Sequence, residues 1–246
     1  ITSGGNYNVT VGDEAGTAIT TGDNNVAVGY NAGGAITTAA LNTLIGGLAG
    51  DALTIGNSNT ALGYNSLTTE VAGDRSVAVG HGSLALQTNA STVDVYNTAV
   101  GYNSGYAVTT GTVNTFVGGL AGDGNTGGSN NTAIGYNSLS ANADTNFNTA
   151  VGNNALAAQN EGGRNVAVGH NALIADTKGG RNVAVGFGSL ATSNQTSVTT
   201  AHNTAVGYNA GTAVTTGVSN TLIGGLTGDA IQAGNQNTFI GYNLAT

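Results

Sequence analysis

The chain has no cysteine, no proline and no methionine, and only 7% of its 246 residues are charged. Without cysteine, neither a disulfide nor a thiolate metal site can form, so burial and stacking must stabilise the fold. With 42 glycines and no proline, the composition differs from that of a two-layer globular domain. The absence of methionine predicts that the sequence is a fragment of a longer protein.

Positive charge is scarce, with four lysines and arginines against twelve acids and a formal net charge of −8. Proteins bind a phosphate backbone through basic residues, so we expect no nucleic-acid partner. No apolar run approaches the roughly 18 residues of a membrane span and no leader opens the chain, so we expect no membrane insertion. Apolar residues still make up 39% of the sequence, which excludes a disordered chain.

One short phrase is repeated fourteen times between Asn8 and Asn237. Each copy has asparagine, a β-branched residue, a small or apolar residue, an aliphatic residue and glycine, as in NVAVGYNAG from Asn25. Successive copies start 17 residues apart, or 21 residues apart at two places. This period predicts an all-β parallel β-solenoid (β-roll) of about 14 coils, spanning residues 1–246 as a single array. Such stacks are more often fibres or binding surfaces than enzymes.

Two positions of the repeat, counted from the leading asparagine, are nearly invariant within the chain. Position 5 is glycine in all fourteen copies, and position 1 is asparagine in thirteen, with serine only at Ser76. Glycine permits a positive φ and a close backbone approach, so it marks a bend after a short strand. Asparagine suits a corner and can hydrogen-bond to its copy one coil away, so we expect an asparagine ladder.

Positions 2 to 4 predict the strand. They hold valine or threonine, then a mostly small residue, then valine, isoleucine or leucine. Alternate side chains of a strand point to opposite faces, and here both faces are largely apolar. Strands of this kind are buried on both faces. One face can line a narrow coil, and the other then requires a partner, so we expect an assembly of several chains.

Residue size varies in concert at positions 3 and 6. A large residue at position 3 accompanies glycine at position 6 and leucine at position 7, whereas tyrosine at position 6 accompanies alanine at position 3. Because close packing conserves volume, we interpret positions 3 and 6 as one shared layer, although Phe239 with Tyr242 departs from the rule. The residues concerned are Leu44, Phe116 and Leu222, Gly47, Gly119 and Gly225, and Tyr30, Tyr64, Tyr102, Tyr136 and Tyr208.

The second half of each repeat is polar, glycine-rich and variable, which predicts a weaker outer strand with turns. Both longer copies place four extra residues there, in segments 84–96 and 190–202. We expect surface loops at both segments, which are also the places where recognition would occur. The two segments lie 106 residues apart, so a longer super-repeat overlays the short one.

Charged residues provide a test of the register. If one repeat forms one coil, equivalent residues of adjacent coils lie about 4.8 Å apart. Glu161 and Lys178 both occupy position 14, so we predict that they are neighbours. Arg164 and Arg181 both occupy position 17, so we predict that they stack near solvent.

Catalytic and metal-binding patterns are missing from the sequence. The acids are scattered over the variable half, and none recurs beside a second one in a suitable setting. His81 and His170 occupy position 6 five coils apart, where they replace tyrosine and cannot share a metal. His202 has no acidic or histidine partner close in sequence. We therefore predict that the chain is not an enzyme and has no catalytic, cofactor-binding or metal-binding residue.

Three further patterns have a structural interpretation beside a functional one. Aspartates that end GGLAGD or GGLTGD are similar to those of calcium-binding β-rolls, but the copies are not in tandem, which favours turn capping. Threonine pairs resemble the ladders of ice-binding solenoids, but position 13 interrupts them. Glycosylation sequons matter only in a glycosylating host. These residues are Asp51, Asp123 and Asp229; Thr20–Thr21, Thr37–Thr38, Thr109–Thr110 and Thr215–Thr216; and Asn8, Asn89, Asn130 and Asn194.

The phrase N-[TV]-A-[VI]-G-[YH]-[NG]-[AS] resembles the repeat of trimeric autotransporter adhesin heads. The segments NTAVGYNAG and NTLIGGLAGDALT are even more similar to arrays in bacteriophage tail-fibre proteins. The resemblance covers nearly the whole chain and implies a left-handed parallel β-roll in which three chains assemble side by side. The 17-residue coil departs from the usually shorter coil of the adhesin heads.

The resemblance implies a structural segment of a trimeric extracellular fibre, foremost a bacteriophage tail fibre of the virion that takes part in host attachment. A trimeric adhesin at the bacterial cell surface is the alternative, and an ice-binding solenoid is a third. The expected partners are two further copies of the chain, giving a homotrimer, and a glycan or protein receptor on a host cell. No cofactor is expected.

Overall fold

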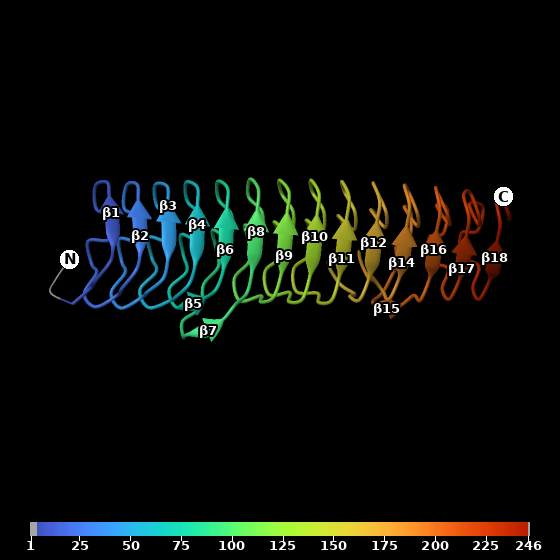
Figure 1. The fold of residues 1–246 in the computed structure, drawn as a ribbon. Coiled ribbons are helices and arrows are strands. Elements are labelled where there is room, and N and C mark those ends of the chain that lie inside the picture. The colour runs from blue at the N-terminus through green and yellow to red at the C-terminus, as the bar shows by residue number, and fades with distance from the viewer. Residues whose placement is uncertain (1–3, 246) are drawn as a thin grey trace. The chain divides into compact units, whose positions relative to one another are not determined.

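The computed structural model describes residues 4–245 and divides the chain into two compact units, Ile1–Leu120 and Ala121–Thr246. Residues 1–3 and 246 of the predicted array lie outside the described residues. Each unit is a stack of parallel coils in which the strands follow one another in chain order (Figure 1). Residues 4–245 contain no helix. The predicted all-β parallel β-solenoid with one repeat per coil is confirmed.

In the N-terminal unit, each repeat contributes one three-residue strand to a parallel ladder. Strand partners are equivalent residues of adjacent repeats, as in Val9 and Val26, and the long coil keeps this pairing between Val77 and Thr98. A two-residue pair, β5 (Gly73–Asp74) with β7 (Val93–Asp94), accompanies the long coil. The ladder strands are β1 (Val9–Val11), β2 (Val26–Val28), β3 (Thr43–Ile45), β4 (Thr60–Leu62), β6 (Val77–Val79), β8 (Thr98–Val100) and β9 (Thr115–Val117).

The C-terminal unit repeats this arrangement. Its long coil pairs Val183 with Thr204 in the ladder and adds a second two-residue pair, β13 (Gly179–Gly180) with β15 (Thr199–Thr200). The ladder strands are β10 (Thr132–Ile134), β11 (Thr149–Val151), β12 (Val166–Val168), β14 (Val183–Val185), β16 (Thr204–Val206), β17 (Thr221–Ile223) and β18 (Thr238–Ile240).

The predicted asparagine ladder is confirmed. The side-chain oxygen of Asn25 accepts a hydrogen bond from the backbone N–H of Asn42 at 3.0 Å, and that of Asn42 accepts one from Asn59 at 2.8 Å. The amide of Asn42 also donates to the carbonyl oxygen of Gly56, 3.0 Å away, at the far corner of its own coil. Each asparagine thus joins two coils and closes its own, which satisfies polar groups that burial would otherwise leave unpaired.

Position 5 requires glycine because the backbones of adjacent coils meet there. Gly63 has a φ of +142°, and a β-carbon on it would lie 2.5 Å from the carbonyl oxygen of Gly80. The same contact repeats from Gly80 to Gly101 at 2.4 Å. No side chain fits between these stacked backbones, so the invariant glycine of the repeat follows from the coil spacing.

The interpretation of positions 3 and 6 as one layer is wrong. Leu44 at position 3 is fully buried inside the coil, whereas Tyr30 at position 6 is 55% exposed. Glycine at position 9 provides the space for a large residue, because β-carbons on Gly33 and Gly50 would each lie 2.8 Å from the Leu44 side chain. The volume exchange of the interior therefore links positions 3 and 9.

The side chains at positions 9 and 12 complete the interior, and their size and polarity vary together from coil to coil. Where position 9 is a buried leucine, position 12 is a buried polar residue. Where position 9 is glycine, position 12 is aliphatic, except at Asn125. Close packing of a narrow coil explains this second exchange. The polar pairs are Leu67 with Glu70, Leu84 with Gln87, Leu139 with Asn142, Leu156 with Gln159, Leu173 with Asp176, and Leu190 with Ser193.

The second half of the coils forms turns rather than the predicted outer strand. The backbone N–H groups of Thr20, Thr21 and Gly22 all donate to the carbonyl oxygen of Thr37, at 3.0 to 3.2 Å. Three successive donors that converge on one acceptor bend the chain, whereas a ladder alternates donors and acceptors. Among residues 4–245, the second half is extended only in the pairs β5–β7 and β13–β15.

The two long segments are surface loops only in their middle. In segment 84–96, Leu84, Gln87 and Val95 are fully buried, whereas Ser91 and Thr92 are exposed. Segment 190–202 is likewise buried near both of its ends and exposed between them. The four extra residues therefore extend a coil that keeps its interior.

Candidate functional surface

The outer face of each strand carries a partly exposed aliphatic side chain at position 4, beside valine or threonine at position 2. At position 4, Val100 and Val117 of the N-terminal unit are each 36% exposed. In the C-terminal unit, Ile134 is 40% and Ile223 is 38% exposed, and Val206 is half-buried. The opposite face of each strand is closed inside the coil, so these side chains form an apolar stripe on the surface. Contiguous exposed apolar surface occurs at protein–protein interaction sites and at ligand-binding grooves.

Aromatic rings at position 6 stack along the coils just after each strand. The ring of His81 lies between those of Tyr64 and Tyr102, with centroid distances of 5.5 and 5.4 Å. His170 stacks on Phe187 at 5.1 Å and an interplanar angle of 7°. The prediction that His81 and His170 fill the tyrosine position is confirmed. These rings add an exposed aromatic surface, since Tyr64 and Tyr102 are 54% and 58% exposed.

No group of three or more histidine, aspartate and glutamate side chains gathers at a metal-binding distance among residues 4–245. His202 is exposed at the end of its long coil.

Burial raises the pKa of Asp123, although the carboxylate accepts hydrogen bonds from the backbone of its own turn. The Thr68 hydroxyl donates to Asp51. One carboxylate oxygen of Asp123 and one of Asp229 have no hydrogen-bond partner. For Asp123, turn capping agrees with these contacts.

The threonine ladder uses its hydroxyl groups within the protein. The hydroxyl of Thr20 donates to the carbonyl oxygen of Thr37 at 2.9 Å, and that of Thr37 donates to Thr54 at 3.1 Å. In the C-terminal unit, the hydroxyl of Thr215 donates to the carbonyl oxygen of Gln232 at 3.1 Å. Because these hydroxyls already join adjacent coils, the ladder is a structural feature of the stack.

The charged residues at positions 14 and 17 lie in the register that the sequence predicts. Lys178 Nζ lies 3.8 Å from a carboxylate oxygen of Glu161, so the predicted neighbours are confirmed. Arg164 and Arg181 lie at the same corner of adjacent coils and are both exposed. The last residue of each coil has a positive φ, with values of 65° and 62° at these two arginines. Sequence reasoning missed this conformation because bulky residues rather than glycine occupy the position.

Two buried carboxylates at position 12 anchor the long coils, and sequence reasoning missed both. Glu70 accepts hydrogen bonds from the backbone N–H groups of the next three residues, at 2.7 to 3.1 Å, and from Gln87 and Asn89 of the following coil. Asp176 accepts from the backbone N–H of Gly179 at 2.8 Å and from Asn182. Burial raises the pKa of Asp176. The only sequence signal was the polar exchange at position 12.

Gln87 also explains the exceptional serine in the asparagine ladder. Ser76 has no amide to continue the ladder toward Asn97. The side-chain amide of Gln87 donates to the Ser76 hydroxyl at 2.9 Å, and its oxygen accepts from the amide of Asn97 at 2.9 Å. Gln87 therefore bridges the gap where the long coil interrupts the repeat.

Comparisons of the chain with protein-family models, with curated proteins and with solved structures found no match. Among residues 4–245 there is no apolar helix of the length needed to cross a bilayer. The repeat and the outward faces of its coils are therefore the observations from which a function can be argued.

Proposed function

We propose that the chain is a structural segment of a trimeric extracellular fibre, of the kind found in bacteriophage tail fibres that take part in host attachment. One observation carries the proposal. The interior of each coil is filled by the chain itself, yet the aliphatic side chains at position 4, on the opposite face of the same strands, remain partly exposed. Contact with further copies would remove this stripe from water, at roughly 25 cal/mol per Å² of apolar surface.

Two features of the fold support a mechanical role. Within each unit, adjacent coils are joined by backbone ladders, by stacked glycines and by the buried asparagine ladder, and backbone hydrogen bonds also join the turns of the second half. Charged residues are few and metal-binding clusters are not found among residues 4–245. In this proposal the function lies in a rigid, repetitive shape that holds a recognition element at a distance from the particle or cell.

The mass in solution tests the proposal. One chain has a mass of 23.8 kDa, so a trimer should have 3 × 23.8, or about 71 kDa, by light scattering at micromolar concentration. A mass of one chain under these conditions would contradict it.

A bacterial trimeric adhesin remains the second candidate, because its proposed architecture would use the same apolar stripe. The gene around this segment distinguishes the two. A self-cleaving chaperone domain beside virion genes is expected for a tail fibre, whereas a signal peptide and a β-barrel anchor are expected for an adhesin.

A further inference from the structure

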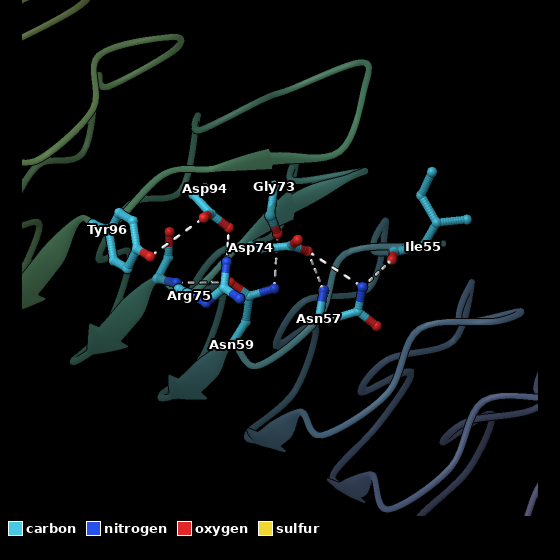
Figure 2. Close-up of polar contacts among 9 residues, drawn as sticks. Ile55, Asn57, Asn59, Gly73, Asp74, Arg75, Asp94 and Tyr96 are labelled. Atoms are coloured by element: carbon cyan, nitrogen blue, oxygen red, sulfur yellow. Dashed lines mark hydrogen bonds and ion pairs between the residues drawn. The ribbon is translucent and has the colours of Figure 1, made fainter.

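The two long coils form matched corners that differ in how an arginine is partnered. In the N-terminal unit, a guanidinium nitrogen of Arg75 forms an ion pair with a carboxylate oxygen of Asp94 (Figure 2). The guanidinium carbon also lies 5.7 Å from the centre of the Tyr96 ring, and the Tyr96 hydroxyl donates to Asp94 at 3.3 Å. Arg75 is thus paired with an acid and an aromatic ring of the long coil that follows it.

The corresponding corner of the C-terminal unit lacks the carboxylate. Arg181 lies 106 residues after Arg75, and the β13–β15 pair places Thr200 opposite Gly180 where the β5–β7 pair places Asp94 opposite Asp74. Among residues 4–245, the Arg181 side chain forms neither an ion pair nor a hydrogen bond.

Arg164 adds a second positive charge on the adjacent coil. Coils lie about 4.8 Å apart, so two like charges start from neighbouring backbone positions. The guanidinium carbon of Arg164 lies 5.4 Å from the ring centre of Phe147, and no acid pairs with it among the described residues. The nearby Lys178 and Glu161 pair with each other. In a chain of net charge −8, this corner is a local basic site without a counterion from the chain.

Both arginines line one hollow. It has a volume of about 270 Å³ and is lined by Arg164, Arg181, Thr199 and Thr200, with Gly162, Gly163, Gly180 and Val198. A second hollow of about 190 Å³ shares Arg164 and continues to Phe147 and Asn146. Phe147 and Val198 are 53% and 62% exposed. The groove formed by the two hollows therefore offers guanidinium groups flanked by apolar surface and threonine hydroxyls.

We propose that this groove binds an acidic saccharide through a carboxylate or sulfate group held by Arg164 and Arg181. Guanidinium groups bind such oxyanions through paired, charge-assisted hydrogen bonds. The exposed faces of Phe147 and Val198 suit the apolar face of a sugar ring, and Thr199 and Thr200 suit its hydroxyl groups. A long polyanion such as a nucleic acid is disfavoured, because the remainder of the chain is acidic. This proposal adds a binding site to the fibre function and does not depend on trimer formation.

Calorimetric titration with four probes tests the site. They are a glucuronic-acid oligosaccharide, a sulfated oligosaccharide, a neutral oligosaccharide of equal length, and sodium sulfate. Thr200→Asp would give Arg181 the partner that Asp94 gives Arg75, so it should weaken binding of the acidic probe at least tenfold. Thr196→Asp makes the same change of charge at an exposed position of the same coil and should leave binding unchanged. Thermal unfolding verifies that both variants fold.

The expected result is binding of an acidic oligosaccharide, but not the neutral one, by the wild type and the Thr196 variant. The proposal is overturned by no binding of either acidic probe at millimolar concentration, or by equal binding to the Thr200 variant. Binding of sulfate alone with the same affinity would also overturn it, since the saccharide would then contribute nothing. None of these outcomes changes the mass expected for the fibre proposal, so the two proposals fail independently.

Discussion

Asp176 is a buried acid whose surroundings change its pKa. It is fully buried, so desolvation raises its pKa above the ordinary 3.8, although hydrogen bonds from Gly179, Lys178 and Asn182 oppose the rise. The folded chain therefore binds a proton at Asp176 more tightly than the unfolded chain does. Its protonated form is compatible with burial, so the acid costs stability at neutral pH.

We predict that the contribution of Asp176 to the free energy of unfolding increases as the pH falls from neutral through its raised pKa, and that this increase ends near pH 3.8. Each pKa unit of difference between the two states corresponds to about 1.4 kcal/mol. Asp176→Asn should remove this component from denaturant unfolding measured between pH 4 and pH 7. Asp123 contributes with the same sign in both proteins, so the difference between the two curves isolates Asp176. Parallel curves would show that the prediction is wrong.

At the scale of elements, the asparagine ladder depends on one bridging side chain at the first long coil. Gln87 contacts Glu70, Ser76 and Asn97, and all four side chains are buried. Gln87→Ala would remove three buried hydrogen bonds, one of them to the Glu70 carboxylate, at about 0.5–1.5 kcal/mol for a neutral bond and about 1.5–3 kcal/mol for a charged one. We predict a loss of about 3 kcal/mol or more in the free energy of unfolding.

Ser193 provides the matched control for this prediction, because it occupies position 12 of the second long coil. Its buried hydroxyl has no hydrogen-bond partner. Ser193→Ala should therefore leave the free energy of unfolding unchanged or raise it by up to about 1 kcal/mol. Equal destabilisation by the two alanine variants in denaturant titrations would contradict the bridging role of Gln87.

The strands and corners of the coil could be predicted from the sequence because invariant residues report backbone constraints. Asn42 and Gly63 illustrate this, since each lies against the equivalent residue of the next coil, Asn59 and Gly80 respectively. The turns could not, because residues that rarely adopt a positive φ do so here. Leu67 has a φ of 53° and is fully buried, and Val113 has a φ of 59° and is exposed. Packing against neighbouring coils overrides the local preference of these residues.

The exposed outer face was also predictable. Positions 2 to 4 predict a strand with two largely apolar faces, and only one of these faces can line the interior of the coil. The groove at Arg164 and Arg181 was not. Sequence reasoning placed the two arginines in one stack, but only the structure shows that Asp94 pairs with Arg75 and that Thr200 occupies the corresponding place beside Arg181.

For the molecule as a whole, one substitution on the outer face of a strand should have a small effect in a single chain and a large effect in an assembly. Val100 lies on the outer face of β8 and is 36% exposed. In a single chain, an aspartate there reaches water and should cost about 1 kcal/mol or less through its low strand propensity. In a trimer that buries this face, the same carboxylate loses its water and weakens assembly by several kcal/mol.

If the proposed trimer forms through this face, Val100→Asp lowers the mass measured by light scattering from that of three chains to that of one. Val100→Thr, which introduces a residue that position 2 already uses, should retain the assembly with reduced thermal stability. Ala90→Asp, at an exposed position of segment 84–96, supplies the control for added charge and should remain trimeric. Circular dichroism separates loss of assembly from loss of fold. If Val100→Asp kept both the trimer mass and the thermal stability of the wild type, the outer face of β8 would not be the interface.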